Sequence, residues 1–273
     1  MADLGVVENV FDVLFTRDVS PELRWTWGDA AHWVYMVASL VVVVFALRYL
    51  KRLPEDRHRK AILWLAGLAF SMWIIPPVIL CVTDTGERWI EHLPLHLCSA
   101  ACIIIPIGLL TRNKTVLGYV YGLCFPGAVM AIVTPGAMYR SLSYLGFHYW
   151  MYNVSHVILI VAGLAPIAMG WYKPSWRQYL PASGIGTAWL IVDYPINKLL
   201  DTNYLFVNIP EPGTPIAAMA DLAGVPGYIG ILAALAYTVI AALFAAWSLI
   251  AWVARRRAPL VGAQPGGGSG GTL

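Results

Sequence analysis

The sequence predicts an all-α protein: a polytopic bundle of seven transmembrane helices, with six as the alternative count. Of the 273 residues, 59% are hydrophobic and 12% are charged, which is far more apolar than the average soluble domain. The apolar residues also come in blocks that approach the length of about 20 residues needed to cross the hydrocarbon layer. We expect one transmembrane domain, residues 30–254, between an N-terminal segment, residues 1–29, and a flexible cytoplasmic tail, residues 255–273.

The N-terminal segment is predicted to form a short helix along the membrane surface. Its apolar residues recur at helical spacing, and they are Leu4, Val7, Phe11, Leu14 and Phe15. Acidic residues take the other face of this helix. The segment has neither a basic n-region nor a cleavage site, so a secretory signal peptide is not expected.

Seven stretches follow that are apolar and about long enough to span the membrane. They are residues 33–50, 61–82, 94–111, 116–135, 147–170, 179–200 and 228–254. Prolines interrupt the second to sixth stretches and are absent from the first and seventh; they are Pro76, Pro77, Pro106, Pro126, Pro166 and Pro195. Because proline kinks a helix, we expect the second to sixth stretches to surround a cavity and the other two to flank it. The alternative is that prolines are simply more frequent in membrane helices.

The basic residues predict the orientation. With the N-terminus outside and the C-terminus inside, 13 of the 18 Lys and Arg residues lie in the inner loops and tail, as the positive-inside rule requires. The net charge of +3 is therefore a signal of topology, and no nucleic-acid partner is expected. The lipid bilayer is the expected surrounding.

Polar and reactive side chains interrupt three of these apolar stretches. They are His96 and Cys98 in the third, His148, Tyr152, Asn153 and His156 in the fifth, and Asp193 in the sixth. An aspartate at the bilayer centre costs about 2.5 to 3.5 kcal/mol on insertion scales, so a functional site is the default hypothesis. With a rise of about 1.5 Å per residue, Cys98, His156 and Asp193 lie about 6, 13 and 10 Å below the outer ends of their helices. These similar depths favour one common site in the outer half of the membrane.

Cys98 is the strongest nucleophile in this set. It lies in the first turns of a helix opened by Pro94, where the positive end of the helix dipole favours a thiolate. A base would come from another helix, as His148 or His156. His96 is not expected to serve, because two residues along a helix correspond to a rotation of about 200° that points its ring away from the thiol.

The neighbours of His156 could orient its imidazole. Asn153 and Tyr152 precede it by three and four residues and share its helix face, and Asp193 is a third candidate. A thiol, an imidazole and an orienting group together indicate acyl transfer, with His96 or Asn153 as candidates for the oxyanion donor. The alternative reading is structural: buried cysteines are mostly inert, and we expect this of Cys81, Cys102 and Cys124. No cysteine pair has zinc-finger or CxxC spacing, so no metal or cofactor is expected.

Several motifs together resemble the YwaF-like integral membrane proteins. They are LPLHLC, GLCFPGAVMAIVTP, FHYWMYNVSH, TNYLFVNIPEPGTP and LAGVPGYIG, and the similarity runs from about residue 30 to residue 254. Vertebrate members of this family are described as acyltransferases that move fatty acyl groups between phospholipids to build ether phospholipids, using a cysteine and a histidine. By motif, the resemblance implies that these residues are Cys98 and His156.

The resemblance implies a membrane-embedded lipid acyltransferase in the bacterial cytoplasmic membrane. Its substrates would be a phospholipid and a lysophospholipid that enter sideways from the bilayer, and it would form an acyl-enzyme on Cys98. We expect the outer loop around Asn203 and Tyr204 to cap the pocket, or alternatively to be a turn-rich connection. Two other classes stay open: a small-molecule or proton-coupled transporter with an intramembrane His/Asp site, and a haem or metal protein that uses His96, His148 or His156 as ligands.

Overall fold

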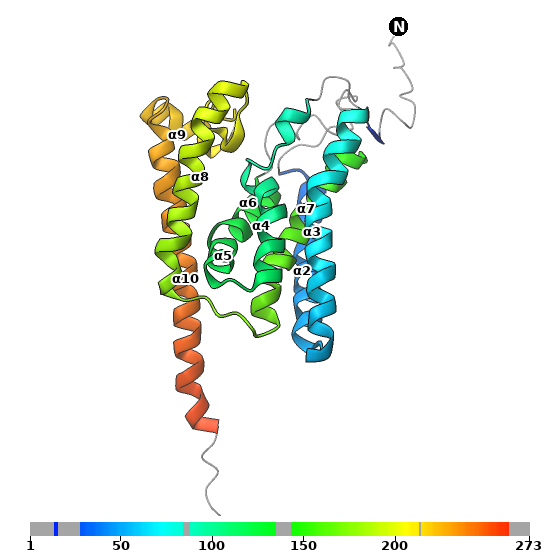
Figure 1. The fold of residues 1–273 in the computed structure, drawn as a ribbon, viewed down its shortest axis with the longest axis vertical. Coiled ribbons are helices and arrows are strands. Elements are labelled where there is room, and N and C mark those ends of the chain that lie inside the picture. Colours follow the sequence, from blue (N-terminus) through cyan, green and yellow to red (C-terminus); the bar gives the residue numbers. More distant parts are fainter. Residues whose placement is uncertain (1–13, 16–27, 84–87, 135–142, 213, 262–273) are drawn as a thin grey trace, which may run out of the picture.

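The computed structural model describes residues 14–15, 28–83, 88–134, 143–212 and 214–261 (Figure 1). Within these ranges the regular structure is helical, and five helical runs are long and apolar enough to cross a membrane. The predicted N-terminal surface helix lies outside the described residues except for Leu14 and Phe15. The Gly-rich end of the chain, from residue 262 onward, lies outside them as well.

Each predicted stretch coincides with a helix or with one continuous helical run. The helices are α2 (Ala30–Arg52), α3 (Glu55–Thr83), α4 (Leu97–Thr111), α5 (Lys114–Tyr119), α6 (Phe125–Val133), α7 (Phe147–Ala168), α8 (Tyr179–Leu200), α9 (Pro215–Ala223) and α10 (Tyr228–Val261). A π-helical turn, η3 (Val120–Cys124), joins α5 to α6, and 3-10 turns form η2 (Trp89–His92), η5 (Trp176–Gln178) and η6 (Tyr204–Phe206). Several bounds differ from the prediction: α3 begins earlier, at Glu55, α10 continues past the expected end at residue 254, and α9 is an additional short helix.

The five runs that qualify as membrane spans are α2, α3, the run from α5 to α6, α7 and α10. The helix α4 is apolar but has only 15 residues. The helix α8 has 22 residues, and its apolar character is interrupted by polar side chains such as Asp193 and Asn197. Length and composition alone therefore assign fewer spans than the seven that the sequence predicts.

Local sequence signals fix several helix ends. The Asp29 carboxylate caps α2 by accepting a hydrogen bond from the N–H of His32 at 2.7 Å. The Asn113 side chain caps α5, where its oxygen accepts from the N–H groups of Thr115 and Val116 at 2.9 and 3.2 Å. Such caps satisfy donors that a helix start leaves unpaired. Between α4 and α5 the connection has only two residues: Arg112, whose left-handed backbone with φ 55° ends α4, and the cap Asn113.

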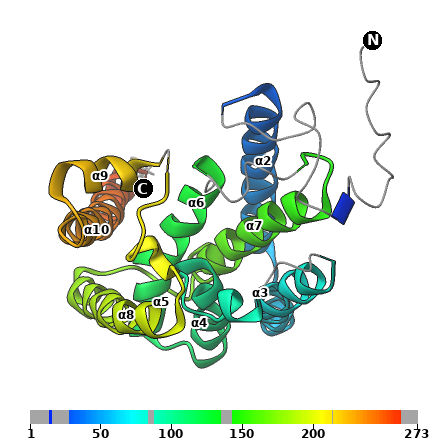
Figure 2. The same ribbon diagram turned by 90° about the horizontal axis from the view of Figure 1, so that it is seen from above.

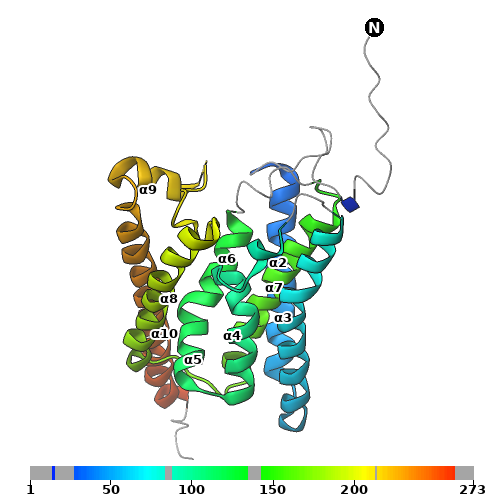
Figure 3. The same cartoon turned by 45° about the horizontal axis from the view of Figure 1, so that its top comes forward.

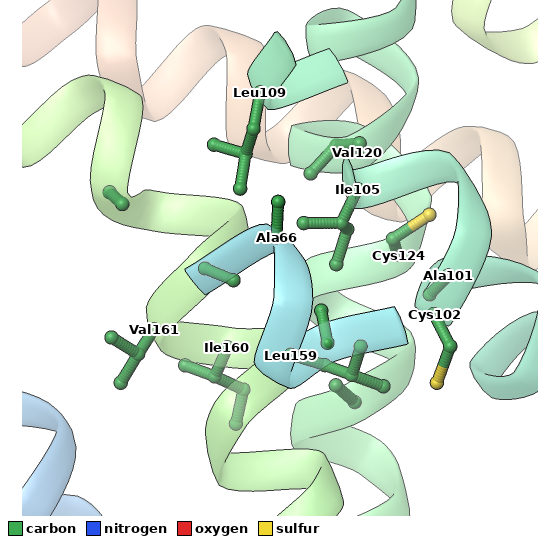
Figure 4. Close-up of a cluster of buried hydrophobic side chains, with 14 of the residues drawn as sticks. Ala66, Ala101, Cys102, Ile105, Leu109, Val120, Cys124, Leu159, Ile160 and Val161 are labelled. Carbon is green, nitrogen blue, oxygen red and sulfur yellow. The ribbon is translucent and has the colours of Figure 1, made fainter. Parts of the chain in front are cut away.

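The main core lies where α3, α4, the α5–α6 run and α7 meet (Figure 4). Its closest contacts use alanines that are fully inaccessible, among them Ala69 in α3, Ala101 in α4 and Ala162 in α7. Small side chains let helix backbones approach closely, which is the usual basis of packing in membranes. The core therefore holds α4 and α7 rigidly side by side.

The helices α8, α9 and α10 form a group at one side of this core (Figures 2 and 3). Thr187 of α8 and Tyr237 of α10 are hydrogen-bonded through their hydroxyl groups. Ile240 and Phe244, both fully buried, pack α10 against η3 in a second cluster. A cavity of about 600 Å³ lies between this group and the core helices.

The residues that line the cavity correct the expectation that only the proline-containing helices surround it. Residues of α3, α4, the α5–α6 run, α7 and α8 line it as predicted, and α2 contributes none of its described residues. However, α10 also forms part of the wall, through residues such as Leu232, Ala236 and Ile240. A helix without proline therefore also lines the cavity, and α10 is not only a flanking support.

Candidate active site

The cavity brings together most of the polar residues that the sequence singles out. Cys98, His96, His148, Tyr152 and His156 all line it. Cys98 is partly buried and faces this space rather than being sealed among aliphatic neighbours. These five residues therefore share one cavity, whose wall is mostly apolar with a few polar groups, as is typical of a binding site.

Cys98 is the second residue of α4. The helix begins at Leu97, three residues later than the Pro94 start that the sequence predicts, because His96 has an extended backbone with φ −65° and ψ 147° and no side-chain cap. In the described chain, the backbone N–H groups of Leu97, Cys98 and Ser99 donate no hydrogen bond. These N–H groups give the start of α4 a positive potential beside the thiol.

The extended backbone at His96 also corrects the predicted direction of its imidazole ring, which we expected to point away from the Cys98 thiol. The rotation of about 200° that would point its ring away from the thiol applies only to two helical residues. Since His96 precedes the first helical residue, the ring is free of that constraint and lines the same cavity as Cys98.

His156 is held in one tautomer by its own helix. Its Nδ1 lies 2.5 Å from the carbonyl oxygen of Tyr152, and a carbonyl can only accept, so Nδ1 carries the hydrogen. Nε2 of the neutral ring therefore keeps its lone pair and can accept a proton. The Tyr152 ring packs 4.2 Å from the imidazole, measured between ring centroids.

The group that orients His156 is thus the main chain of Tyr152. The Tyr152 hydroxyl instead donates to the carbonyl oxygen of Ala131 at 3.0 Å. Asn153, a second predicted orienting residue, donates to the carbonyl oxygen of Tyr149 at 2.9 Å and does not line the cavity. The spacing of four residues placed Tyr152 beside His156, but the group that bonds to His156 is the main-chain carbonyl of Tyr152 and not a side chain.

His148 and Asp193 have different surroundings from His156. His148 lines the cavity, but its Nε2 lies 3.1 Å from the carbonyl oxygen of Phe15 and 3.3 Å from the Thr83 hydroxyl. Asp193 is completely buried in α8 and does not line the cavity. Neither of its carboxylate oxygens has a hydrogen-bond partner among the described residues.

The loop between α8 and α9 forms part of the cavity wall, although Asn203 and Tyr204 themselves do not line it. Leu205 and Phe206 contribute to the lining, together with Glu211 and Thr214. The Leu205 N–H donates to Nδ1 of His96 at 3.3 Å. Sequence reasoning missed this contact, because a backbone donor carries no side-chain signal.

The fold and the cavity define an integral membrane protein that is helical throughout its described regular structure, with a thiol and an imidazole on the wall of one cavity. The chain belongs to the TMEM164 family, whose family model matches residues 26–251. This is the family of the vertebrate ether-lipid acyltransferase, to which the sequence resemblance also pointed. A place among the bacterial YwaF-like proteins stays a prediction. No curated protein and no solved structure gives a significant match to the chain.

Proposed function

We propose that the protein is a lipid acyltransferase in which Cys98 and His156 carry a fatty acyl group between phospholipids. The observation that carries the proposal is that both side chains line the same largely apolar cavity. The free Nε2 of His156 and the uncapped start of α4 at Cys98 suit a base and a nucleophile. Membership of the TMEM164 family supports the same chemistry.

The proposed first half-reaction forms an acyl-enzyme. Nε2 of His156 takes the thiol proton as the Cys98 sulfur bonds to the ester carbonyl carbon of a glycerophospholipid. The tetrahedral intermediate then collapses, and the bond between that carbon and the ester oxygen breaks. His156 returns the proton to the departing alkoxide, which leaves as a lysophospholipid.

The second half-reaction reverses these steps with a different alcohol. His156 takes the proton of a lysophospholipid hydroxyl as that oxygen bonds to the thioester carbonyl carbon. The carbon–sulfur bond then breaks, and His156 returns the proton to the Cys98 sulfur. A cavity with few polar groups excludes water, which would otherwise hydrolyse the thioester. The product is a phospholipid with a new acyl chain, and no cofactor is consumed.

The proposal includes seven membrane spans, with α4 and α8 crossing in addition to the five that length and composition identify. It places the N-terminus outside, the C-terminus inside and the site near the outer face, in a bacterial cytoplasmic membrane. The distribution of basic residues supports this orientation. Substrate would then enter the cavity directly from the lipid phase.

A transfer assay in vesicles tests the function. Purified protein is reconstituted with a phospholipid that carries an isotope-labelled acyl chain and with a lysophospholipid of a different head group. We expect the label to appear on the second head group with wild-type protein and not with Cys98→Ala. Cys102→Ala, which changes another cysteine of the same cavity wall, is the matched control. A transporter would leave the label on its original head group, and that result would refute the proposal.

A further inference from the structure

The loop between α8 and α9 brings the backbone N–H of Leu205 to the candidate site. Two residues of this loop have an unusual backbone conformation. Leu205 and Phe206 have φ values of 54° and 56°, in the left-handed region that residues with a Cβ atom rarely adopt. Such strain persists only where the surrounding structure enforces it, and it is common at functional sites. The question is which contacts enforce it here.

Three anchors hold this loop from different elements. Asn197 of α8 is fully buried, and its amide accepts from the Tyr204 N–H at 2.6 Å and donates to the Tyr204 carbonyl oxygen at 2.9 Å. The Tyr228 hydroxyl at the start of α10 donates to the carbonyl oxygen of Phe206 at 2.6 Å. The Tyr204 hydroxyl bonds to the carbonyl oxygen of Ile90. Together they fix the backbone on both sides of Leu205.

This anchored loop sets the tautomer of His96. Since a backbone N–H can only donate, the 3.3 Å contact from Leu205 makes Nδ1 of His96 an acceptor without a hydrogen. The hydrogen of the neutral imidazole must then be on Nε2. Tyr204 and Phe206 fix the plane of the ring, with centroids 5.2 and 5.4 Å from that of the imidazole.

His156 and His96 are therefore held as opposite tautomers. His156 is a donor through Nδ1 and keeps an acceptor at Nε2, whereas His96 accepts through Nδ1 and keeps a donor at Nε2. A reaction through a tetrahedral intermediate needs both kinds of group: one acceptor for the thiol proton, and donors for the negative charge on the former carbonyl oxygen.

We propose that His96 is a further catalytic residue, whose Nε2–H stabilises the oxyanion together with the backbone N–H groups at the start of α4. Those of Cys98 and Ser99 donate no other hydrogen bond within the described chain. Leu205 acts as a positioning residue through its main chain. The proposal rests on the acyl-transfer function above and assigns a role that the cysteine and the base do not fill.

Two reactions of the same thiol separate this role from a structural one. Acylation of Cys98 by a labelled phospholipid passes through an oxyanion, whereas alkylation by iodoacetamide displaces iodide and forms none. We expect His96→Ala to slow acylation by about 100- to 1,000-fold, the usual effect of losing one oxyanion donor, and to leave alkylation unchanged. Both rates are measured by mass spectrometry of the peptide that contains Cys98.

A pair of amide variants tests the geometry. The side-chain nitrogen of Gln reaches about as far as Nε2 of histidine, and that of Asn only about as far as Nδ1. His96→Gln should therefore restore most of the acylation rate, and His96→Asn should not. His156→Ala, by removing the base, should slow both reactions.

The inference is overturned if His96→Ala acylates at the wild-type rate, or if His96→Gln is as slow as His96→Asn while both are alkylated normally. Equal slowing of acylation and alkylation in both amide variants would also overturn it, because it would show a structural role. A wild-type protein that alkylates but never acylates would instead refute the proposed function, and the inference with it.

Discussion

At the scale of single residues, hydrogen-bond partners separate histidines that look equivalent in the sequence. His148 and His156 share α7 and the same cavity. Nε2 of His148 is already paired with the carbonyl oxygen of Phe15, whereas His156 uses Nδ1 for its main-chain bond. Because a carbonyl can only accept, the neutral His148 ring carries its hydrogen on Nε2 and the neutral His156 ring carries it on Nδ1, so the two rings are opposite tautomers.

We therefore expect His156→Ala to reduce acyl transfer by about 100-fold or more, the usual contribution of a general base. His148→Ala should have a much smaller effect, because it removes a contact with the N-terminal segment and not the proton acceptor. The rate of label transfer in vesicles measures both, and thermal unfolding checks that each variant folds. Equal losses in the two variants would contradict the assignment.

Asp193 gives a second residue-scale prediction. It is fully buried without a hydrogen-bond partner in the described chain, and burying an ionised carboxylate in this way is far more costly than burying a neutral group. Asp193→Asn removes the possible charge with little change of shape. We expect the variant to unfold at the same or a higher temperature and to keep its acyl-transfer rate. A folded but inactive variant would instead favour a role in proton transfer or transport.

At the scale of elements, we expect the position of the first residues of α4 to depend on their packing against α6. A Cβ atom added at Gly127 would lie 2.6 Å from Cδ2 of Leu97, the residue that precedes the nucleophile. Gly127→Val must displace Leu97, and overpacking of this kind costs about 1 to 3 kcal/mol. We expect a lower unfolding temperature and slower acylation of Cys98.

Gly67→Val is the matched control for this variant. It makes the same substitution in α3, where an added Cβ would meet nothing within 4 Å. We expect it to retain the wild-type acylation rate. If the two variants behave alike, the contact between α4 and α6 does not position the thiol.

The helices themselves follow from the sequence, because lipid requires each backbone group to bond within its own segment. Apolar blocks therefore located every long helix in the described chain, including α8 with its buried Asp193. The π-helical turn of η3 was not predicted, since it depends on packing against α10. The late start of α4 was missed because Pro94 is a valid first residue of a helix.

The sequence indicated which side chains to consider for the candidate site, but not the hydrogen bonds that they make. Intramembrane Cys98 and His156 are conspicuous because hydrocarbon does not solvate them. The roles of the Tyr152 carbonyl and the Leu205 N–H depend on main-chain atoms that every residue has. No sequence pattern distinguishes such atoms, so the tautomers of the two histidines required the three-dimensional structure.

At the scale of the whole molecule, the cavity lies between the core helices and the group formed by α8, α9 and α10. The proposed acyl transfer requires the acyl chain of the phospholipid to occupy this cavity. Ala236 of α10 lines the cavity, so Ala236→Trp should fill part of it and reduce acylation of Cys98 by phospholipid. Alkylation by the much smaller iodoacetamide should change little.

Ala234→Trp provides the control on the same helix. Ala234 is exposed and does not contribute to the cavity wall, so a tryptophan there should face the surrounding lipid without affecting the site. Comparable acylation by the two tryptophan variants would show that the acyl chain does not use this cavity.

The most direct test of the central claim is to trap the acyl-enzyme. Purified protein is incubated with the labelled phospholipid alone, without an acceptor, quenched in acid and analysed by mass spectrometry of its cysteine peptides. We expect one labelled acyl group on Cys98, sensitive to hydroxylamine as a thioester is, and absent from His156→Ala within the same time. Label on no cysteine, or on Cys102 in place of Cys98, would contradict it.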